Sequence, residues 1–466
     1  MSYPRIILAG TNSAVGKTTL TLGIILALRK RGLKVQPFKA GPDYIDPTYH
    51  TQISGRFCRN LDSWLLSRKV VLELFERQAK IADISVIEGV MGLYDGLGDA
   101  EEGSTAHLAK LLACPVILVV DVYSMSRSAG AQVLGYREFD KRVNIAGVIL
   151  NNVGSVTHYQ DTKSVIEVKT KTPVLGFLPK DSTLRLPERH LGLIPTQEKK
   201  LLSAFCKKLL NLVEKNIDMD RIIRISRQTQ GFPSGRKIIF SPKPVQNKIT
   251  VAVARDEAFD FYYQDNLDIL EYFGAKLVEF SPLRSKRLPR DIDGIYIGGG
   301  FPELFAPQLA GNTQLKDELY QRVKNGLPVY AECGGLMYLM EKLVDFHGED
   351  FSMVGVFKGS VSMAKKLQFL GYVEVETLKN NILSKKGDRN KAHIFHWSYL
   401  KDIPDNVRFA YKIRNNKGVF YDGLIKENVL ASYAHLHFAS NVDFAKNFIR
   451  SCREYKKLRM KKSAYG

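Results

Sequence analysis

Short apolar runs alternate with amphipathic stretches through the first half of the chain. The apolar runs are rich in β-branched residues and bounded by turn residues, which is typical of buried strands. A helix is expected over residues 20–31. Strands separated by helical stretches indicate parallel βαβ units with helices on both faces of a sheet. The expected strands are residues 6–9, 34–38, 84–88, 116–121, 145–151 and 174–178.

The alternation starts again in the second half. Residues 228–248 are rich in Pro, Gly, Ser and Lys, which is typical of an interdomain linker. Beyond them, strands are expected at residues 249–254, 276–280, 294–297 and 329–331, and helices at 264–273 and 314–325. The pattern predicts an α/β fold with two domains, each a mostly parallel sheet flanked by helices. We place these domains at residues 1–230 and 248–466, with a linker at 231–247.

The 466 residues are enough for two or three domains, and at 45% hydrophobic and 25% charged residues each half can bury a core. No apolar run reaches the roughly 18 residues that a membrane span needs. Residues 1–10 lack the pattern of a signal peptide, so we expect a cytoplasmic protein with no membrane partner. The five cysteines are scattered and form no CxxC pair, which argues against disulfides and a zinc site.

The chain carries a net charge of +20, with a basic cluster in residues 453–462. A solvated tail is the simplest interpretation of the cluster. The second is attraction of a polyanionic substrate, because excess positive charge concentrates anions near the surface. Nucleic acid is the weakest of the three, because the sequence has no motif for binding it.

A phosphate-binding loop follows the first expected strand. Residues 10–19 read GTNSAVGKTT and lead directly into a helix, which is the context that such a loop requires. Backbone N–H groups surround the phosphates, Lys17 adds a cation, and the Thr18 hydroxyl can ligate Mg²⁺. The loop departs from the common pattern, because five residues separate Gly10 from Gly16 and Thr11 stands where a glycine is expected.

This variant loop is similar to that of dethiobiotin synthetase and its relatives, which use ATP to phosphorylate a carboxylate. Asn151 and Asn152 end another expected strand, and residues 176–179 follow the next; in related folds such loops face the adenine. The candidate ATP-binding residues are Gly10, Thr11, Asn12, Gly16, Lys17, Thr18 and Thr19.

Acidic residues gather where the neighbouring strands end. The segments KAGPDYIDPTYH, residues 39–50, and VIEGVMGLYDG, residues 86–96, carry them. Ligands bind at the carboxyl ends of strands in open α/β sheets, so these side chains can meet a metal ion or the substrate. A single loop aspartate is as often a turn residue, and the prediction therefore depends on the joint pattern. The four acidic residues are Asp43, Asp46, Glu88 and Asp95.

A second reactive site is expected around Cys333. Residues 330–336 read YAECGGL, so a strand at 327–330 passes through a tight turn into a helix at 336–342. The two glycines permit a strained backbone, and a thiol at such a turn lies in a cleft at a helix N-terminus, where the thiolate is favoured. Cys333 is therefore a candidate nucleophile rather than a packing residue.

The base for this thiol must come from elsewhere in the chain. Residues 431–441, ASYAHLHFASN, offer His435 and His437, and we expect only one of them to meet Cys333. The segment GGGFPE, residues 298–303, follows another expected strand, and its backbone N–H groups can hold the oxyanion of a tetrahedral intermediate. The candidate residues of this pocket are Gly298, Gly299, Gly300 and Gly334.

The chain resembles the cobyrinate a,c-diamide synthase family over essentially its whole length. The motifs that carry the resemblance are, in chain order, the variant phosphate loop, GPDYIDP, EGVMGLYDG, GGGFPE, AECGG and the final histidine. The resemblance implies a P-loop NTPase-like domain followed by a class I glutamine amidotransferase-like domain. It implies that Asp43 and Glu88 join Thr18 around Mg²⁺. It also places the tetrapyrrole carboxylates near Tyr44, Ile45, Asp46 and Asp95.

Two positions depart from the pattern of such enzymes. In triad-type glutamine amidotransferases the base follows a Tyr-x pair, which selects His435, and most have a glutamate two residues later. His437 stands at that place here, so the group that orients His435 is left open. Ile45 stands where leucine is expected, a change that can affect substrate choice or be silent.

The resemblance implies an ATP- and glutamine-dependent ligase of cobalamin biosynthesis. Cys333 and His435 would release ammonia from glutamine, ATP·Mg²⁺ would phosphorylate the a and c acetate carboxylates of cobyrinate, and ammonia would displace the phosphate. The implied partners are ATP, glutamine and an anionic tetrapyrrole, with a homodimer expected for the family.

Other substrates, and one other class of ATPase, are alternatives to this interpretation. Ni-sirohydrochlorin or hydrogenobyrinate would be amidated through the same motifs. Cobyric acid synthase fits less well, because GPDYIDP is not its pattern. A ParA-like ATPase switch would need neither Cys333 nor His435, and it would need a second lysine early in the phosphate loop, where residues 11–15 read TNSAV.

Overall fold

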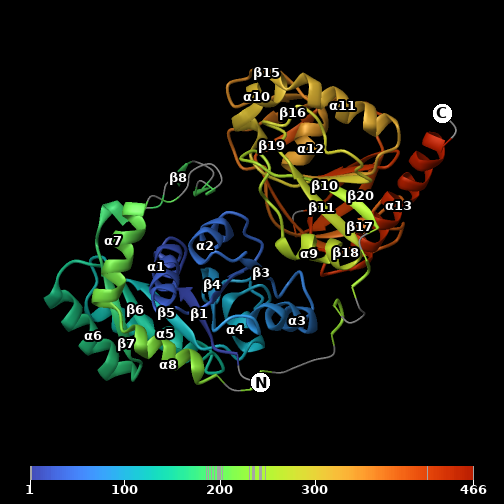
Figure 1. Ribbon diagram of the computed structural model, residues 1–466. Coiled ribbons are helices and arrows are strands. Elements are labelled where there is room, and N and C mark those ends of the chain that lie inside the picture. The colour runs from blue at the N-terminus through green and yellow to red at the C-terminus, as the bar shows by residue number, and fades with distance from the viewer. Residues whose placement is uncertain are drawn as a thin grey trace. The chain divides into compact units, whose positions relative to one another are not determined.

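The computed structural model divides the chain into two compact units, Met1–Ile238 and Ile239–Gly466 (Figure 1). The predicted linker at 231–247 spans the division, but residues 233–236, 241–243 and 247 within it lie outside the described residues. The structure describes residues 3–184, 186, 188–189, 192–193, 195–196, 201, 203–229, 231–232, 237–240, 244–246, 248–416 and 418–464.

The N-terminal unit is built on a seven-stranded sheet in the order β3-β2-β4-β1-β5-β6-β7. All its pairings are parallel, as the alternation of strands and helices predicts. Every strand predicted for this unit is present. The sheet also contains β3, which was not predicted because three residues are too few to give a strand pattern. The strands are β1 Arg5–Gly10, β2 Val35–Ala40, β3 Arg59–Leu61, β4 Ile84–Gly92, β5 Val116–Asp121, β6 Ile145–Val153 and β7 Val174–Pro179.

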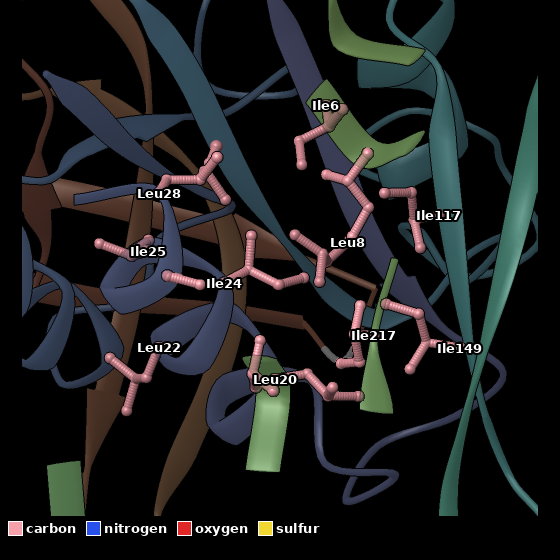
Figure 2. Packing of buried hydrophobic residues seen from close by; sticks show 14 of the residues in the cluster. Ile6, Leu8, Leu20, Leu22, Ile24, Ile25, Leu28, Ile117, Ile149 and Ile217 are labelled. Atoms are coloured by element: carbon pink, nitrogen blue, oxygen red, sulfur yellow. The ribbon is translucent and has the colours of Figure 1, made fainter. Parts of the chain in front are cut away.

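Helices cover both faces of this sheet (Figure 1). The main core lies between the central strands and α1, where Ile24 and Leu8 belong to one buried cluster (Figure 2). Gly23 lets α7 approach α1, because a Cβ there would lie 2.6 Å from Val213. The helices are α1 Lys17–Lys30, α2 Asp46–Ser54, α3 Arg68–Ala79, α4 Thr105–Leu111, α5 Arg127–Phe139, α6 Val156–Thr170, η1 Ser182–Leu184, α7 Ser203–Asn216 and α8 Met219–Arg227, with a hairpin of β8 Glu188–Arg189 and β9 Gly192–Leu193.

The C-terminal unit has a ten-stranded sheet in the order β11-β10-β12-β13-β22-β21-β20-β17-β18-β23. The pairings from β11 to β22 are parallel and the remaining ones are antiparallel. The prediction of a mostly parallel sheet therefore holds only for the part of the sheet from β11 to β22. Short connections in the later part of the chain join antiparallel neighbours, because a parallel pair needs a longer crossover. The strands are β10 Ile249–Ala254, β11 Ala275–Phe280, β12 Gly294–Ile297, β13 Val329–Glu332, β17 Phe369–Thr377, β18 Arg389–His396, β20 Phe409–Asn415, β21 Gly418–Lys426, β22 Val429–Ser432 and β23 His435–Leu436.

A second, four-stranded sheet adds β14 Met340–Val344, β15 Asp350–Ser352, β16 Phe357–Met363 and β19 Ser398–Lys401. The helix predicted at 336–342 is shorter and earlier, because β14 begins at Met340. Within the described residues, no helix is both long enough and apolar enough to cross a membrane. The helices of this unit are α9 Gln264–Tyr272, η2 Pro302–Phe305, α10 Ala306–Gly311, α11 Thr313–Lys324, α12 Gly334–Leu339 and α13 Asp443–Ala464.

Arg5 at the start of β1 is fully buried and donates hydrogen bonds to three backbone carbonyls. Its guanidinium reaches Leu112 O at 2.8 Å, Tyr3 O at 2.8 Å and Ala113 O at 3.1 Å. We expect Arg5→Met to destabilise the N-terminal unit by about 2–4 kcal/mol, because two buried carbonyls and the part-buried carbonyl of Ala113 lose their donor. Urea unfolding measures the change, with the exposed Arg142→Met as control. A loss no larger than that of the control would contradict this role.

Candidate functional site

The phosphate-binding loop lies between β1 and α1, as predicted. Gly16 has φ of +90°, and a Cβ on it would collide with Nδ2 of Asn151. Only glycine meets both conditions without strain. The Asn151 amide in turn donates to Val15 O at 2.9 Å, so the end of β6 holds the loop in shape.

Lys17 and Thr18 stand at the first turn of α1. The Lys17 ammonium donates to Asn12 O at 3.0 Å and to Met91 O at 2.7 Å. Burial and the charge of Lys39 lower the pKa of Lys17 to about 8. Thr18 Oγ1 donates to Glu88 Oε1 at 2.8 Å, which joins the loop to the middle of β4, because this strand continues past Glu88 to Gly92. The loop thus presents one cation and one hydroxyl beside a buried carboxylate.

Lys39 at the end of β2 is a central residue of this site that the sequence analysis did not assign. Its ammonium lies 2.5 Å from Asp46, 2.8 Å from Glu88 and 3.7 Å from Asp43. Burial alone would lower its pKa, but the three carboxylates outweigh burial and raise it well above the usual value. The sequence signal was a lysine on a buried strand, directly before the acidic loop.

His50 on α2 is a second residue that the sequence analysis did not assign. Its Nε2 lies 2.6 Å from Glu88 Oε2, and both side chains are fully buried. Burial raises the pKa of Glu88, but the charges of Lys39 and His50 outweigh burial and hold it well below its usual range. Burial and the charge of Asp43 raise the pKa of Asp46 well above its usual range. Glu88 is therefore the firmly ionised carboxylate of the cluster.

These residues border a cavity of about 880 Å³ in the N-terminal unit. Asn151, Asn152 and Pro179, which the sequence analysis linked to adenine, line the same cavity. Nucleotide-sized space thus adjoins the loop, the carboxylates and the ends of β6 and β7. The predicted site residues that line it are Gly16, Lys17, Thr18, Thr19, Asp43, Asp46 and Glu88.

Other predicted residues lie outside the cavity lining. Ile45 packs against the core of the unit. Asp95 accepts a hydrogen bond from the Gly92 N–H at 2.9 Å, so its carboxylate holds a turn. For these residues a contact with nucleotide or substrate stays a prediction. The residues not in the lining are Gly10, Thr11, Asn12, Tyr44, Ile45 and Asp95.

The C-terminal unit contains the predicted thiol turn. Cys333 joins β13 to α12 with φ of 47° and ψ of −102°, a conformation that non-glycine residues rarely adopt. Gly334 and Gly335 allow neighbouring segments to come close, because a Cβ at these positions would lie 2.9 Å from Pro302 Cδ and 2.5 Å from Ile297 O. The thiol lies 3.6 Å from the carbonyl oxygen of Phe395 on β18.

His435 on β23 is the histidine that meets this thiol. Its Nδ1 lies 3.2 Å from Glu332 Oε2, and its hydrogen bond with Cys333 contributes to its raised pKa. Burial opposes the charged form, but the interactions with Cys333 and Glu332 outweigh burial and raise the pKa of His435 to about 10. The imidazole is therefore set between a thiol and a carboxylate.

His437 faces away from the thiol. Its ring stacks on Tyr263 with centroids 4.5 Å apart, and its Nδ1 accepts the Ala439 N–H at 3.3 Å. Residues two apart on a regular strand share a face, but β23 ends at Leu436 and the chain then turns. Burial lowers the pKa of His437 to about 3, which fits a neutral packing residue.

The glycine-rich segment after β12 offers fewer oxyanion donors than the sequence suggested. The Gly298 N–H donates to the Tyr262 hydroxyl at 2.7 Å, and the Gly299 N–H donates to Phe261 O at 3.2 Å. Both groups are therefore used within the protein. Gly300 lies against the nucleophile turn, because a Cβ on Gly334 would lie 3.0 Å from its nitrogen. This leaves Gly300 and Gly334 as the candidates for oxyanion binding.

Comparison with known proteins finds a family model for each unit of the chain. Residues 6–194 match the CobQ/CobB/MinD/ParA nucleotide binding domain, and residues 250–442 match the CobB/CobQ-like glutamine amidotransferase domain. A cobyrinate a,c-diamide synthase of Dehalococcoides mccartyi is 47% identical over 98% of this chain and 99% of its own. The chain belongs to the cobyrinate a,c-diamide synthase family. A member from Caldanaerobacter subterraneus is 44% identical over 96% of this chain and 98% of its own. One from Methanosarcina barkeri is 41% identical over 98% of this chain and 98% of its own.

The nucleotide-binding domain implies that this member of the cobyrinate a,c-diamide synthase family uses ATP. The side chains beside the loop fit the metal ion that accompanies ATP, because Mg²⁺ prefers oxygen ligands and binds through few protein groups plus phosphates. Thr18 Oγ1 and Glu88 Oε1, 2.8 Å apart, supply such oxygens. The third predicted ligand, Asp43, accepts the N–H groups of Ile45 and Asp46 through Oδ1, and its Oδ2 lies 3.7 Å from Lys39 Nζ.

Proposed function

We propose that the chain converts the a and c acetate carboxylates of cobyrinate into carboxamides, using ATP and ammonia released from glutamine. The observation that supports this most is the pairing of two sites in one chain. One unit holds a buried thiol, imidazole and carboxylate, and the other holds a phosphate loop beside an ionised carboxylate. The similar proteins are cobyrinate a,c-diamide synthases, which favours cobyrinate as the tetrapyrrole.

Glutamine hydrolysis is the work of the C-terminal unit. His435 accepts the Cys333 proton, and the thiolate attacks the side-chain carbonyl of glutamine. The oxyanion that forms is bound by the N–H groups of Gly300 and Gly334. His435 returns the proton to the leaving nitrogen, which departs as ammonia and leaves a thioester. Water then attacks the thioester, gives its proton to His435, and releases glutamate and the free thiol.

Amide formation is the work of the N-terminal unit. A carboxylate oxygen of the tetrapyrrole attacks the γ-phosphorus of ATP, which gives an acyl phosphate and ADP. Lys17 and Lys39 place positive charge beside the transferring group, and Thr18 and Glu88 would hold Mg²⁺. Mg²⁺, when bound, neutralises phosphate oxygens in the transfer. Ammonia then attacks the acyl carbon, and inorganic phosphate leaves.

The alternative acceptors would use the same residues. Ni-sirohydrochlorin and hydrogenobyrinate also carry acetate groups, and neither phosphate-loop chemistry nor thiol chemistry distinguishes the rings. The similarity to cobyrinate a,c-diamide synthases favours cobyrinate over these two rings. A ParA-like switch would have no use for the glutamine amidotransferase domain matched at residues 250–442.

The test is incubation of the full chain with ATP, Mg²⁺ and glutamine, and with each of the three rings in turn. Each carboxylate-to-amide conversion lowers the ring mass by about one dalton, as the acyl-transfer chemistry requires. We expect two conversions of cobyrinate. Amidation of the nickel ring alone would keep the mechanism and change the substrate, and ATP hydrolysis with no amidation of any ring would contradict the proposal.

A further inference from the structure

The structure assigns Glu332 as the residue that positions His435 for catalysis. This role rests on the proposed glutamine hydrolysis and goes beyond it, because the usual glutamate two residues after the base is replaced here by His437. Glu332 instead precedes the nucleophile Cys333 directly in the chain. The carboxylate thus comes from the strand that carries the nucleophile and not from the one that carries the base.

The contact between Glu332 and His435 is closed to water. The carboxylate oxygen Oε2 lies 3.2 Å from Nδ1 of the ring, and each side chain is only 1% exposed. An Nδ1–H that donates to Oε2 fixes the tautomer, so the other ring nitrogen is the one that takes the thiol proton. In a buried site, a hydrogen bond to a charged acceptor is stronger than one between neutral groups.

The second oxygen of Glu332 is also held. Oε1 accepts hydrogen bonds from the Tyr330 hydroxyl and, at 3.4 Å, from the Leu436 N–H. Leu436 follows His435 on β23, so the same carboxylate binds both the ring and the backbone beside it. Burial is the main cause of the raised pKa values of Tyr330 and Tyr296, and the nearby charge of Glu332 raises both further. Glu332 is therefore fixed before substrate arrives.

The backbone at Cys333 explains how neighbouring residues reach one imidazole. Consecutive side chains on a strand point to opposite faces. Glu332 ends β13, and the positive φ of Cys333 breaks the strand at the next residue. The turn brings the thiol around to the histidine that Glu332 already contacts. The strained turn thus serves the geometry of all three groups.

Other titratable groups near His435 do not fill this role. Asp422 on β21 accepts the backbone N–H groups of Tyr433 and Ala434 at 3.1 and 2.9 Å, so it holds the segment before the base. His393 and His396 on β18 are cationic when charged, and burial lowers the pKa of each, to about 3 and about 4. Glu332, by contrast, has a carboxylate oxygen 3.2 Å from Nδ1 of the ring itself.

The test replaces Glu332 by glutamine, which keeps size and one acceptor oxygen but removes the charge. We expect kcat for glutamine hydrolysis to fall about 100- to 10,000-fold, with the KM for glutamine changed less than about threefold, because a misplaced tautomer affects the chemical step. Glu332→Asp, which keeps the charge on a shorter side chain, should recover part of the loss. Tyr330→Phe, which removes one hydrogen bond to Oε1, serves as the milder matched variant.

Ammonia-dependent amidation of cobyrinate is measured in the same preparations. If Glu332→Gln keeps the wild-type rate with ammonium chloride but loses the rate with glutamine, the assignment is supported. A Glu332→Gln variant with wild-type kcat for glutamine would overturn it, and so would equal losses in Glu332→Gln and Glu332→Asp. Failure of the wild-type chain to amidate cobyrinate with either nitrogen source would count against the proposed function and leave the hydrolysis assay to decide on Glu332.

Discussion

Cys333→Ala is expected to lower glutamine-dependent amidation by about 10⁴-fold or more. Among the described residues of this site, only Cys333 supplies a thiol that can form the thioester. Amidation driven by ammonium chloride should stay within about twofold of wild type, since the phosphate site lies in the other unit of the chain. Ring mass and glutamate release measure the two reactions. Equal loss of both would contradict the division of labour.

The two histidines provide the matched comparison for this prediction. His435→Ala should reproduce the pattern of Cys333→Ala, because the base and the nucleophile act as a unit. His437→Asn keeps an acceptor for the Ala439 N–H and should leave glutamine hydrolysis largely intact, since His437 faces Tyr263. If His437→Asn is the variant that loses glutamine use, the choice of base is wrong.

Glu88→Gln is expected to lower amidation at least about 100-fold with either nitrogen source, the reverse of the pattern for Cys333. Glu88 accepts the Thr18 hydroxyl and contacts both Lys39 and His50, so the neutral amide alters each of these three contacts. Labelling of Cys333 by a glutamine-like diazo ketone should proceed at the wild-type rate, because that reaction needs only the C-terminal unit.

The control for Glu88→Gln is the same change at Glu138 on α5, whose side chain is 48% exposed. Glu138→Gln should leave amidation unchanged. The thermal midpoint of Glu88→Gln should also be recorded, since Lys39 keeps Asp46 as a partner and the fold is expected to survive. A folded Glu88→Gln variant with normal ammonia-dependent amidation would remove Glu88 from the phosphate site.

Both reactive loops could be predicted because their signals are local. The turn at Gly16 and the one at Cys333 are each dictated by a few consecutive residues between a strand and a helix. The residues that the sequence analysis missed act across long separations instead. Lys39 meets Glu88 49 positions away, and Glu332 meets His435 103 positions away. Only strand order and register bring such pairs together.

The glycine-rich segment after β12 shows the same limit of local signals. Four glycine N–H groups were candidates for the oxyanion pocket, but Gly298 and Gly299 donate to Tyr262 and Phe261. These acceptors lie far back in the sequence, on the loop before α9, and nothing in GGGFPE indicates them. The half-antiparallel sheet was missed for a related reason, since strand direction depends on connections and not on the apolar pattern of each strand.

The backbone of Cys333 has a consequence for how this site can change over generations. An L-residue held at φ of 47° costs of order 1–3 kcal/mol, and glycine in its place would relieve most of that strain. Retaining the cysteine therefore means forgoing the conformational stability that glycine would add at this position. A descendant that no longer needed glutamine, because ammonia was plentiful, would be expected to drift to glycine at this position and become more stable as it lost the activity.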